Sequence, residues 1–160
     1  MEDVFNTGQT ESERMAAAGR ILFRLGLLGA VPLIVLALWL ASIAGDHPWR
    51  AATIMLLTQY AAVVLSFLGG IRWGLAMGQR AQPRKLDMVV SLLPPLVAWA
   101  SLSVPLPYTF AVLAAAYAAQ GAWDAFAVHW GAAPHWYGRL RGILTAIAVA
   151  TLVLAFLATG

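Results

Sequence analysis

Long apolar runs dominate the chain, and short segments rich in proline, glycine or charge separate them. A helix needs about 20 mostly apolar residues, within a range of roughly 17–25, to cross the hydrocarbon core of a bilayer. Five runs reach or exceed this range, at residues 25–44, 51–77, 86–104, 108–130 and 142–158. Their pattern lacks the alternation of a barrel strand. It predicts an all-α membrane protein built as a bundle of five transmembrane helices.

The segment before the first apolar run contains a sequence pattern that is typical of the start of a helix. Thr10 and Glu13 have the spacing of a capping box, which predicts a short helix from Thr10 through Leu22. We expect this helix to lie at the membrane interface and the residues before Thr10 to be disordered. The first apolar run is longer than the roughly 7–15 residues of a signal-peptide core, so we expect it to be retained. The chain then divides into a tail with an interfacial helix, residues 1–24, and a transmembrane domain, residues 25–158.

Composition excludes whole classes of protein. Apolar residues make up 61% of the chain and charged residues 11%, whereas soluble domains carry about 25% charged residues. A soluble domain and a disordered chain are therefore both excluded. The absence of cysteine excludes a disulfide or thiolate–metal scaffold. We attribute the net charge of +3 to membrane orientation rather than to binding of nucleic acid.

The basic residues are distributed unevenly between the two sides of a five-helix bundle. With five spans, the N-terminus and the second and fourth connections share one side. Nine of the ten Lys and Arg residues fall there, and only Arg50 falls on the other side. Since positive residues favour the cytoplasmic side, the N-terminus is expected in the cytoplasm and the C-terminus outside. The nine are Arg14, Arg20, Arg24, Arg72, Arg80, Arg84, Lys85, Arg139 and Arg141. We expect five of them to form a cytoplasmic basic face, namely Arg80, Arg84, Lys85, Arg139 and Arg141.

Arg72 and Asp124 are the candidate ionisable groups inside the apolar runs. Both runs start outside and both residues lie near the cytoplasmic ends, so the two side chains reach a similar depth. Pairing would offset the cost of removing both charges from water. Gln120 and Tyr117 share a helical face with Asp124, so we predict an intramembrane polar network of Arg72, Asp124, Gln120 and Tyr117.

This network has two interpretations. In the first, Arg72 reaches toward lipid phosphate and Asp124 stabilises helix packing. In the second, Asp124 is a proton or cation site, or the network lines a cavity for a small molecule.

Small residues recur along one face of the second run. This ridge predicts close packing against another helix, which we expect to be the fourth span. A contact between copies of the chain and a groove for a ligand or lipid are the alternatives. The helix-packing residues are Ala62, Ser66, Gly69, Gly70, Gly74 and Gly78.

Pro94 and Pro95 interrupt the third run in its middle. Proline lacks a backbone donor, so the carbonyls of Val90 and Ser91 lose their helical partners. We predict a kink or hinge. Coordination of a cation by the exposed carbonyls is the alternative.

Signatures of catalysis and of metal binding are missing from the sequence. The chain has no Gly-x-Ser-x-Gly, His-Glu-x-x-His, phosphate-loop or dinucleotide motif. His47, His129 and His135 have no partner at helical spacing, so we interpret them as interfacial residues. We therefore expect no catalytic residues, no metal and no cofactor.

Residues 65–74, with the letters LSFLGGIRWG, closely resemble the signature of an uncharacterised membrane-protein family. This domain-of-unknown-function family includes bacterial inner-membrane proteins and mitochondrial transmembrane protein sixty-nine. Residues 134–141, with the letters PHWYGRLR, followed by Leu144 and Thr145, resemble its second landmark. The resemblance covers roughly residues 25–157 and implies a small polytopic membrane protein without an established activity. It carries over no site residues.

Together these features predict a non-enzymatic interaction or assembly protein that binds other membrane proteins or anionic lipids. The alternative is a small transporter or channel for protons, cations or a small solute, using Asp124 and the kinked third helix. A homo-oligomer is compatible with both. We expect the bacterial cytoplasmic (inner) membrane rather than the mitochondrial inner membrane, because the chain starts without an Arg- and Ser-rich, acid-poor transit segment.

Overall fold

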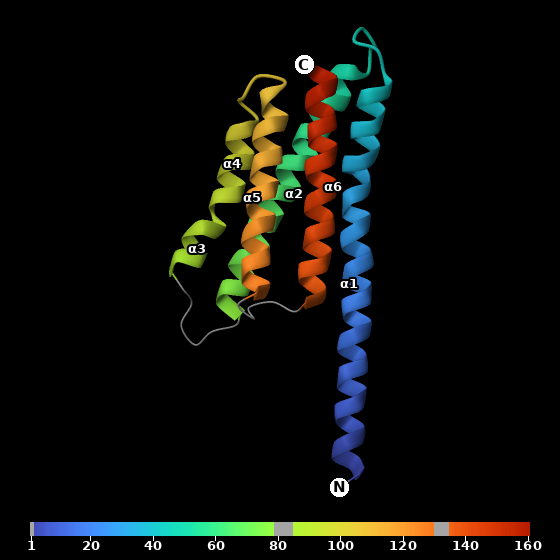
Figure 1. Cartoon of the computed structure of the whole chain (residues 1–160), viewed down its shortest axis with the longest axis vertical. Coiled ribbons are helices and arrows are strands. Elements are labelled where there is room, and N and C mark those ends of the chain that lie inside the picture. Colours follow the sequence, from blue (N-terminus) through green and yellow to red (C-terminus); the bar gives the residue numbers. More distant parts are fainter. Residues whose placement is uncertain (1, 79–84, 130–134) are drawn as a thin grey trace.

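The structure, a computed structural model, describes residues 2–78, 85–129 and 135–160, and every regular element in these ranges is a helix. The helices are α1 (Glu2–Ser42), α2 (Arg50–Gly78), α3 (Lys85–Ser91), α4 (Leu93–Ser101), α5 (Tyr108–His129) and α6 (His135–Thr159). They lie alongside one another in an up-and-down bundle (Figure 1). The all-α prediction is confirmed.

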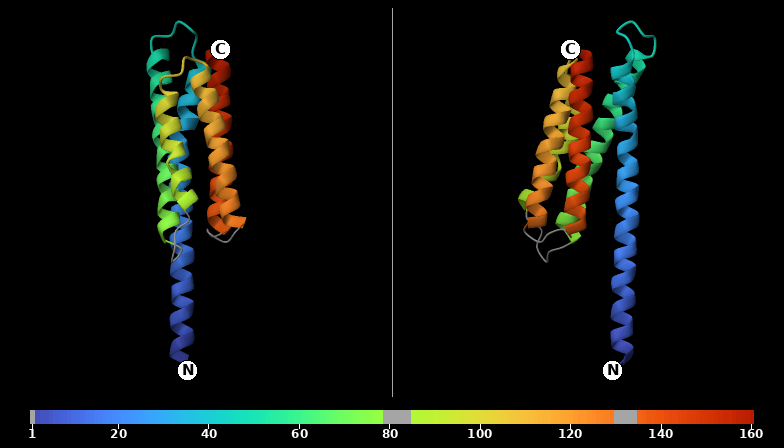
Figure 2. Two further views of the ribbon diagram at one scale, coloured as in Figure 1. Left: turned by 90° about the vertical axis from the view of Figure 1, so that its left-hand side faces the viewer. Right: turned by 45° about the vertical axis from the view of Figure 1, so that its right-hand side comes forward.

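The two chain ends lie at opposite ends of the bundle. The C-terminus lies beside the connections at residues 43–49 and 102–107, whereas α1 projects far beyond the other end (Figure 1 and Figure 2). The end of α2 and the start of α6 also lie at that other end. We call it the basic end, because Arg72 lies within the last two turns of α2 and Arg139 and Arg141 lie within the first two turns of α6.

The N-terminal segment differs from the sequence prediction. The helical backbone runs without a break from Glu2 to Ser42, so the predicted helix start at Thr10 and the predicted separation of this helix from the first span are both wrong. The physical reason is that residues 10–24 contain no proline, and a single glycine inside a helix costs only about 1 kcal/mol. Nothing local ends the helix before the first apolar run begins.

The bundle buries small and branched apolar side chains and exposes many large ones. Its core includes Leu40 of α1, Leu65 of α2, Phe110 of α5 and Leu152 of α6, all fully buried. Large hydrophobic side chains such as Trp99 are exposed on the outside. An apolar exterior of this kind is compatible with lipid and not with water.

Three helical segments are long and apolar enough to cross a membrane, namely Gly19–Ser42, Arg50–Met77 and Trp136–Thr159. Asp87–Ser101 is a shorter apolar helix. The membrane class of the protein is therefore supported by length and composition. The fourth run forms α5, a helix of 22 residues that packs against α2, α4 and α6.

The third run is broken where the proline pair predicts. α3 ends at Ser91 and α4 begins at Leu93, with Pro94 in its first turn, where a missing N–H is tolerated. The carbonyl oxygen of Ser91 points at α2 and lies only 2.7 Å from the position that a Cβ on Gly69 would take. The kink is thus confirmed, and the absent side chain of Gly69 is what lets the broken helix approach α2.

The small-residue ridge does not pack as predicted. Gly69 meets the α3–α4 junction, which belongs to the third run rather than the fourth. Gly70 and Gly74 face open space, with no atom within 4 Å of an added Cβ. Ala62 is buried and Ser66 is half-buried, while the surroundings of Gly78 lie outside the described residues. A continuous contact with the fourth span is wrong, because only part of the ridge turns toward the bundle.

The side chain of Arg50 links helices at the end of the bundle where the C-terminus lies. Its guanidinium donates to the carbonyl of Ile43, at 3.4 Å, and to the carbonyl of Ala158. These are last-turn or post-helix carbonyls that lack helical donors. One side chain at the start of α2 therefore links the ends of α1 and α6.

Candidate functional site: a buried charged cluster

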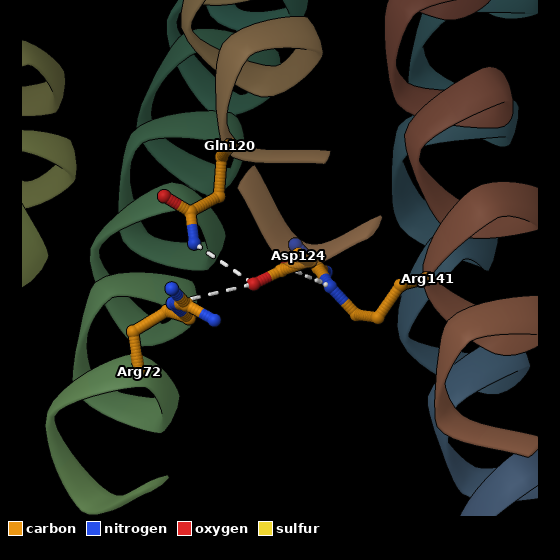
Figure 3. Close-up of polar contacts among 4 residues, drawn as sticks. All are labelled: Arg72, Gln120, Asp124 and Arg141. Carbon is orange, nitrogen blue, oxygen red and sulfur yellow. Dashed lines mark hydrogen bonds and ion pairs between the residues drawn. The ribbon is translucent and has the colours of Figure 1, made fainter. Parts of the chain in front are cut away.

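The carboxylate of Asp124 lies between two arginines in the interior of the bundle (Figure 3). Asp124 is 1% exposed. Its Oδ2 accepts a hydrogen bond from Arg141 Nε at 2.6 Å, and its Oδ1 lies 3.6 Å from Arg72 Nε. Gln120 Nε2 donates to Oδ1 at 3.5 Å. We call Arg72, Gln120, Asp124 and Arg141 the charged cluster.

Three helices supply these side chains. Gln120 and Asp124 are one turn apart on α5, so their side chains share a face. Arg72 lies six residues before the end of α2, and Arg141 lies six residues after the start of α6. At a rise of about 1.5 Å per residue, both arginines sit roughly 9 Å inside the helix ends. The cluster therefore joins α2, α5 and α6 at one level near the basic end.

The structure brings Arg72 and Asp124 together as the sequence predicts. It also shows a stronger partner that sequence reasoning missed. Arg141 is 4% exposed and makes the shorter contact with Asp124, so its placement on the cytoplasmic basic face is wrong. In the sequence it resembles a loop residue, because it directly precedes the last apolar run. The pattern that indicates the burial of Arg141 is a helical stripe, because Arg141 shares the buried face of α6 with Ala148, Leu152 and Ala155.

Tyr117 does not take part in the cluster. Its hydroxyl donates to the carbonyl of Ala61 on α2 at 2.8 Å, and its side chain is buried. Tyr60 makes a similar bond to the carbonyl of Gly29 on α1, at 2.7 Å. Both tyrosines link neighbouring helices, and the hydroxyl of Tyr117 donates to the backbone of α2 rather than to the charged cluster.

The charges of the cluster do not balance. Two guanidinium groups face one carboxylate. The guanidinium carbon of Arg72 also lies 5.6 Å from the centre of the Trp123 ring, a cation–π contact that holds it in place. Among the described residues, Arg141 Nη2 and Thr145 Oγ1 are buried polar side-chain atoms without a hydrogen-bond partner.

The α5–α6 contact beside the cluster is very close. A Cβ on Gly121 would lie 2.5 Å from Thr145 Oγ1 and 2.6 Å from its methyl carbon. The backbone of α5 therefore closes the space on the Thr145 side of Arg141.

The remaining basic residues are distributed over the outside of the basic end. Arg139 is exposed, as are Arg20 and Arg24 on α1. The Trp136 ring lies 3.7 Å from the position that a Cβ on Gly19 would take. This part of α1 therefore lies level with the start of α6. Arg80, Arg84 and the side chain of Lys85 lie outside the described residues. We call Arg20, Arg24 and Arg139 the arginine rim.

Metal ligands do not gather anywhere in the described ranges, where no three His, Asp or Glu side chains could hold an ion. The imidazole of His47 instead packs edge-on against Trp39. A cavity of about 290 Å³ lies between α2 and the connection at residues 102–107. It is lined by Thr58, Gln59, Thr109 and apolar side chains and includes no residue of the charged cluster.

Comparison with known proteins places this arrangement in a family. The family described as "Protein of unknown function (DUF3429)" matches residues 18–157. Transmembrane protein 69 of Xenopus tropicalis is 33% identical over 136 residues, which are 81% of this chain and 51% of that protein. The chain thus spans about half the length of this curated relative. No solved structure matches the chain. Since the matched region contains nearly all of the bundle and the whole charged cluster, the chain belongs to the DUF3429 family of proteins of unknown function, as residues 65–74 and 134–141 predicted.

Proposed function

We propose that the protein is a non-enzymatic interaction or assembly protein of the bacterial cytoplasmic membrane. In this proposal the charged cluster makes the bundle rigid, and the arginine rim binds acidic segments of other membrane proteins. The engagement of both carboxylate oxygens of Asp124 is the observation that carries the proposal. A carboxylate held from two sides is suited to fixing helices rather than to exchanging a proton or cation.

The proposed topology has five spans, with α3 and α4 together forming a kinked third span and α5 the fourth. The arginines support a cytoplasmic N-terminus. Arg72, Arg139 and Arg141 lie near the basic end, whereas Arg50 begins α2 at the opposite end. This asymmetry follows the positive-inside rule.

The arginine rim supports binding to an acidic partner. Arg20 and Arg24 are four residues apart on α1, so their side chains project from one helical face. Arg139 is exposed on α6, close to the half-exposed Trp136. Arginine binds carboxylates through paired N–H groups, and arginine and tryptophan are typical of protein interfaces.

Affinity purification from native membranes tests this role. The wild type is expected to retain membrane-protein partners, and the R20Q/R24Q/R139Q variant is expected to lose them. The R20K/R24K/R139K variant keeps the charge and serves as the matched control, with most of the partner retained. A wild-type monomer free of protein partners, or equal recovery with the glutamine variant, would overturn the proposal. Loss of anionic lipid instead of protein from the glutamine variant would assign the rim to the lipid surface.

A small transporter or channel is the second candidate, because an ionisable carboxylate inside a membrane bundle is costly and often functional. Flux of protons or cations in proteoliposomes would support it if Asp124→Asn abolished the flux and Arg139→Gln did not.

A further inference from the structure

The unequal charges of the cluster call for a ligand of negative charge. Asp124 neutralises one guanidinium, which leaves a second one without a carboxylate of its own among the described residues. An uncompensated buried charge is strongly unfavourable. A water molecule could accept a hydrogen bond from Arg141 Nη2, but it would leave the charge in place. An anion would satisfy both needs.

We propose that the charged cluster binds a phosphate oxyanion beside Asp124, with Arg72 and Arg141 as its ligands, at the level of the cytoplasmic headgroups. Arg141 uses Nε for Asp124, and its buried Nη2 has no hydrogen-bond partner within residues 2–78, 85–129 and 135–160. Guanidinium groups are well matched to phosphate oxygens in charge and in the planar arrangement of their donors.

The surroundings of the two arginines indicate the side from which the anion enters. The backbone of α5 closes the Thr145 side through Gly121. The side chain of Arg72 is 11% exposed, compared with 5% for that of Arg141, so the cluster reaches the surface at Arg72. The Trp123 ring beside the guanidinium of Arg72 would hold it in place when the anion binds. The phosphate can come from a lipid headgroup or from the aqueous phase, and both sources offer the same chemistry.

The first arm of the test uses the full-length protein in neutral detergent and inorganic phosphate as the probe. Thermal unfolding is followed by tryptophan fluorescence, with chloride replacing phosphate at matched ionic strength. Phosphate is expected to raise the Tm saturably by about 2–4 °C, the shift typical of modest stabilisation in a chain of this size. The second arm uses native mass spectrometry to compare retention of phosphatidylglycerol with that of phosphatidylcholine.

Arg72→Gln is the decisive variant, because it removes the excess charge and keeps the 2.6 Å pair between Arg141 and Asp124. It is expected to lose the phosphate effect and to retain at least tenfold less phosphatidylglycerol. Arg72→Lys keeps the charge at the same position and is expected to retain most of both effects.

The two arms separate the sources of the phosphate. Binding in both arms supports a site open to soluble phosphate, and binding of phosphatidylglycerol alone supports a headgroup site. No response of the wild type in either arm overturns the inference, as does full retention of both effects in Arg72→Gln. The proposed assembly role can fail separately, because it depends on the arginine rim and on recovery of protein partners.

Discussion

At the residue scale, the buried carboxylate of Asp124 is stabilised by its ion-pair and hydrogen-bond partners. A fully buried carboxylate is stable only when paired charges and hydrogen bonds replace the water that it has lost. Arg141 supplies the short contact, while Arg72 and Gln120 lie at 3.6 Å and 3.5 Å from the other oxygen. We therefore expect unequal energetic coupling, with Arg141 the dominant partner.

A double-mutant cycle tests this order of partners. Asp124→Ala leaves the buried Arg141 and the mostly buried Arg72 without compensation and is expected to lower the free energy of unfolding by about 3–5 kcal/mol. Adding Arg141→Ala to it should cost about 1–3 kcal/mol less than the sum of the single changes. The coupling to Arg72→Ala should be smaller, because that contact is longer. Unfolding in detergent gives all three values, and additive losses at Arg141 would contradict the pairing.

The sequence identifies three of the four cluster residues, namely Arg72, Gln120 and Asp124. Arg72 and Asp124 stand out because each interrupts an apolar run, and their equal depth makes them partners. Arg141 does not stand out, since it directly borders a run and resembles the loop arginines around it. Its burial depends on how α6 is rotated against α5, which is a property of tertiary packing. A helical-stripe analysis that extended the last run by one turn would have indicated it.

At the element scale, the contact between α2 and the α3–α4 junction depends on a single missing side chain. Pro94 and Pro95 release backbone carbonyls in the middle of the third run. One of them, that of Ser91, approaches α2 at Gly69, where any other residue would place a Cβ 2.7 Å from the oxygen. The break in one helix and the glycine in the other therefore form one structural feature.

Two adjacent glycines provide a matched test of this contact. Gly69→Ala would bring a Cβ to 2.7 Å from Ser91 O and 2.8 Å from Pro95 Cδ, so we expect a loss of about 1–3 kcal/mol in the free energy of unfolding. Gly70→Ala meets no atom within 4 Å and should stabilise the helix by up to about 1 kcal/mol. Equal effects of the two substitutions would show that the close approach is absent.

The helices themselves were more predictable than their contacts. The apolar runs and the proline pair determine where helices form and where the third one breaks. The helix that the small-residue ridge contacts could not be predicted in the same way, since packing decides which small residues face the bundle. The unbroken α1 shows another limit, because a capping box marks a favourable start without forcing one when the preceding residues also tolerate a helix.

At the scale of the whole molecule, the charged residues differ in how deeply they are buried and in the end of the bundle at which they lie. The buried arginines join three helices, the arginine rim lies outside the basic end, and Arg50 links helices at the opposite end. This arrangement supports a rigid bundle with its binding surface on the cytoplasmic side. The orientation can be examined directly because the chain contains no cysteine.

Single cysteines introduced at the two ends are expected to react from different sides of the membrane. Ser103→Cys lies in an exposed turn at the C-terminal end and should react with an impermeant maleimide in intact bacterial cells. Arg20→Cys should react only after the membrane is opened, because Arg20 belongs to the basic end. The reverse labelling pattern would invert the proposed topology.

The central claim is that buried charges maintain the bundle while exposed charges bind the partner. It is tested most directly by measuring partner recovery per folded molecule, in one affinity purification, for Asp124→Asn and for R20Q/R24Q/R139Q. We predict that the folded fraction of Asp124→Asn retains the partner and that the rim variant, fully folded, loses it. Loss of the partner from folded Asp124→Asn, with full recovery by the rim variant, would contradict the account.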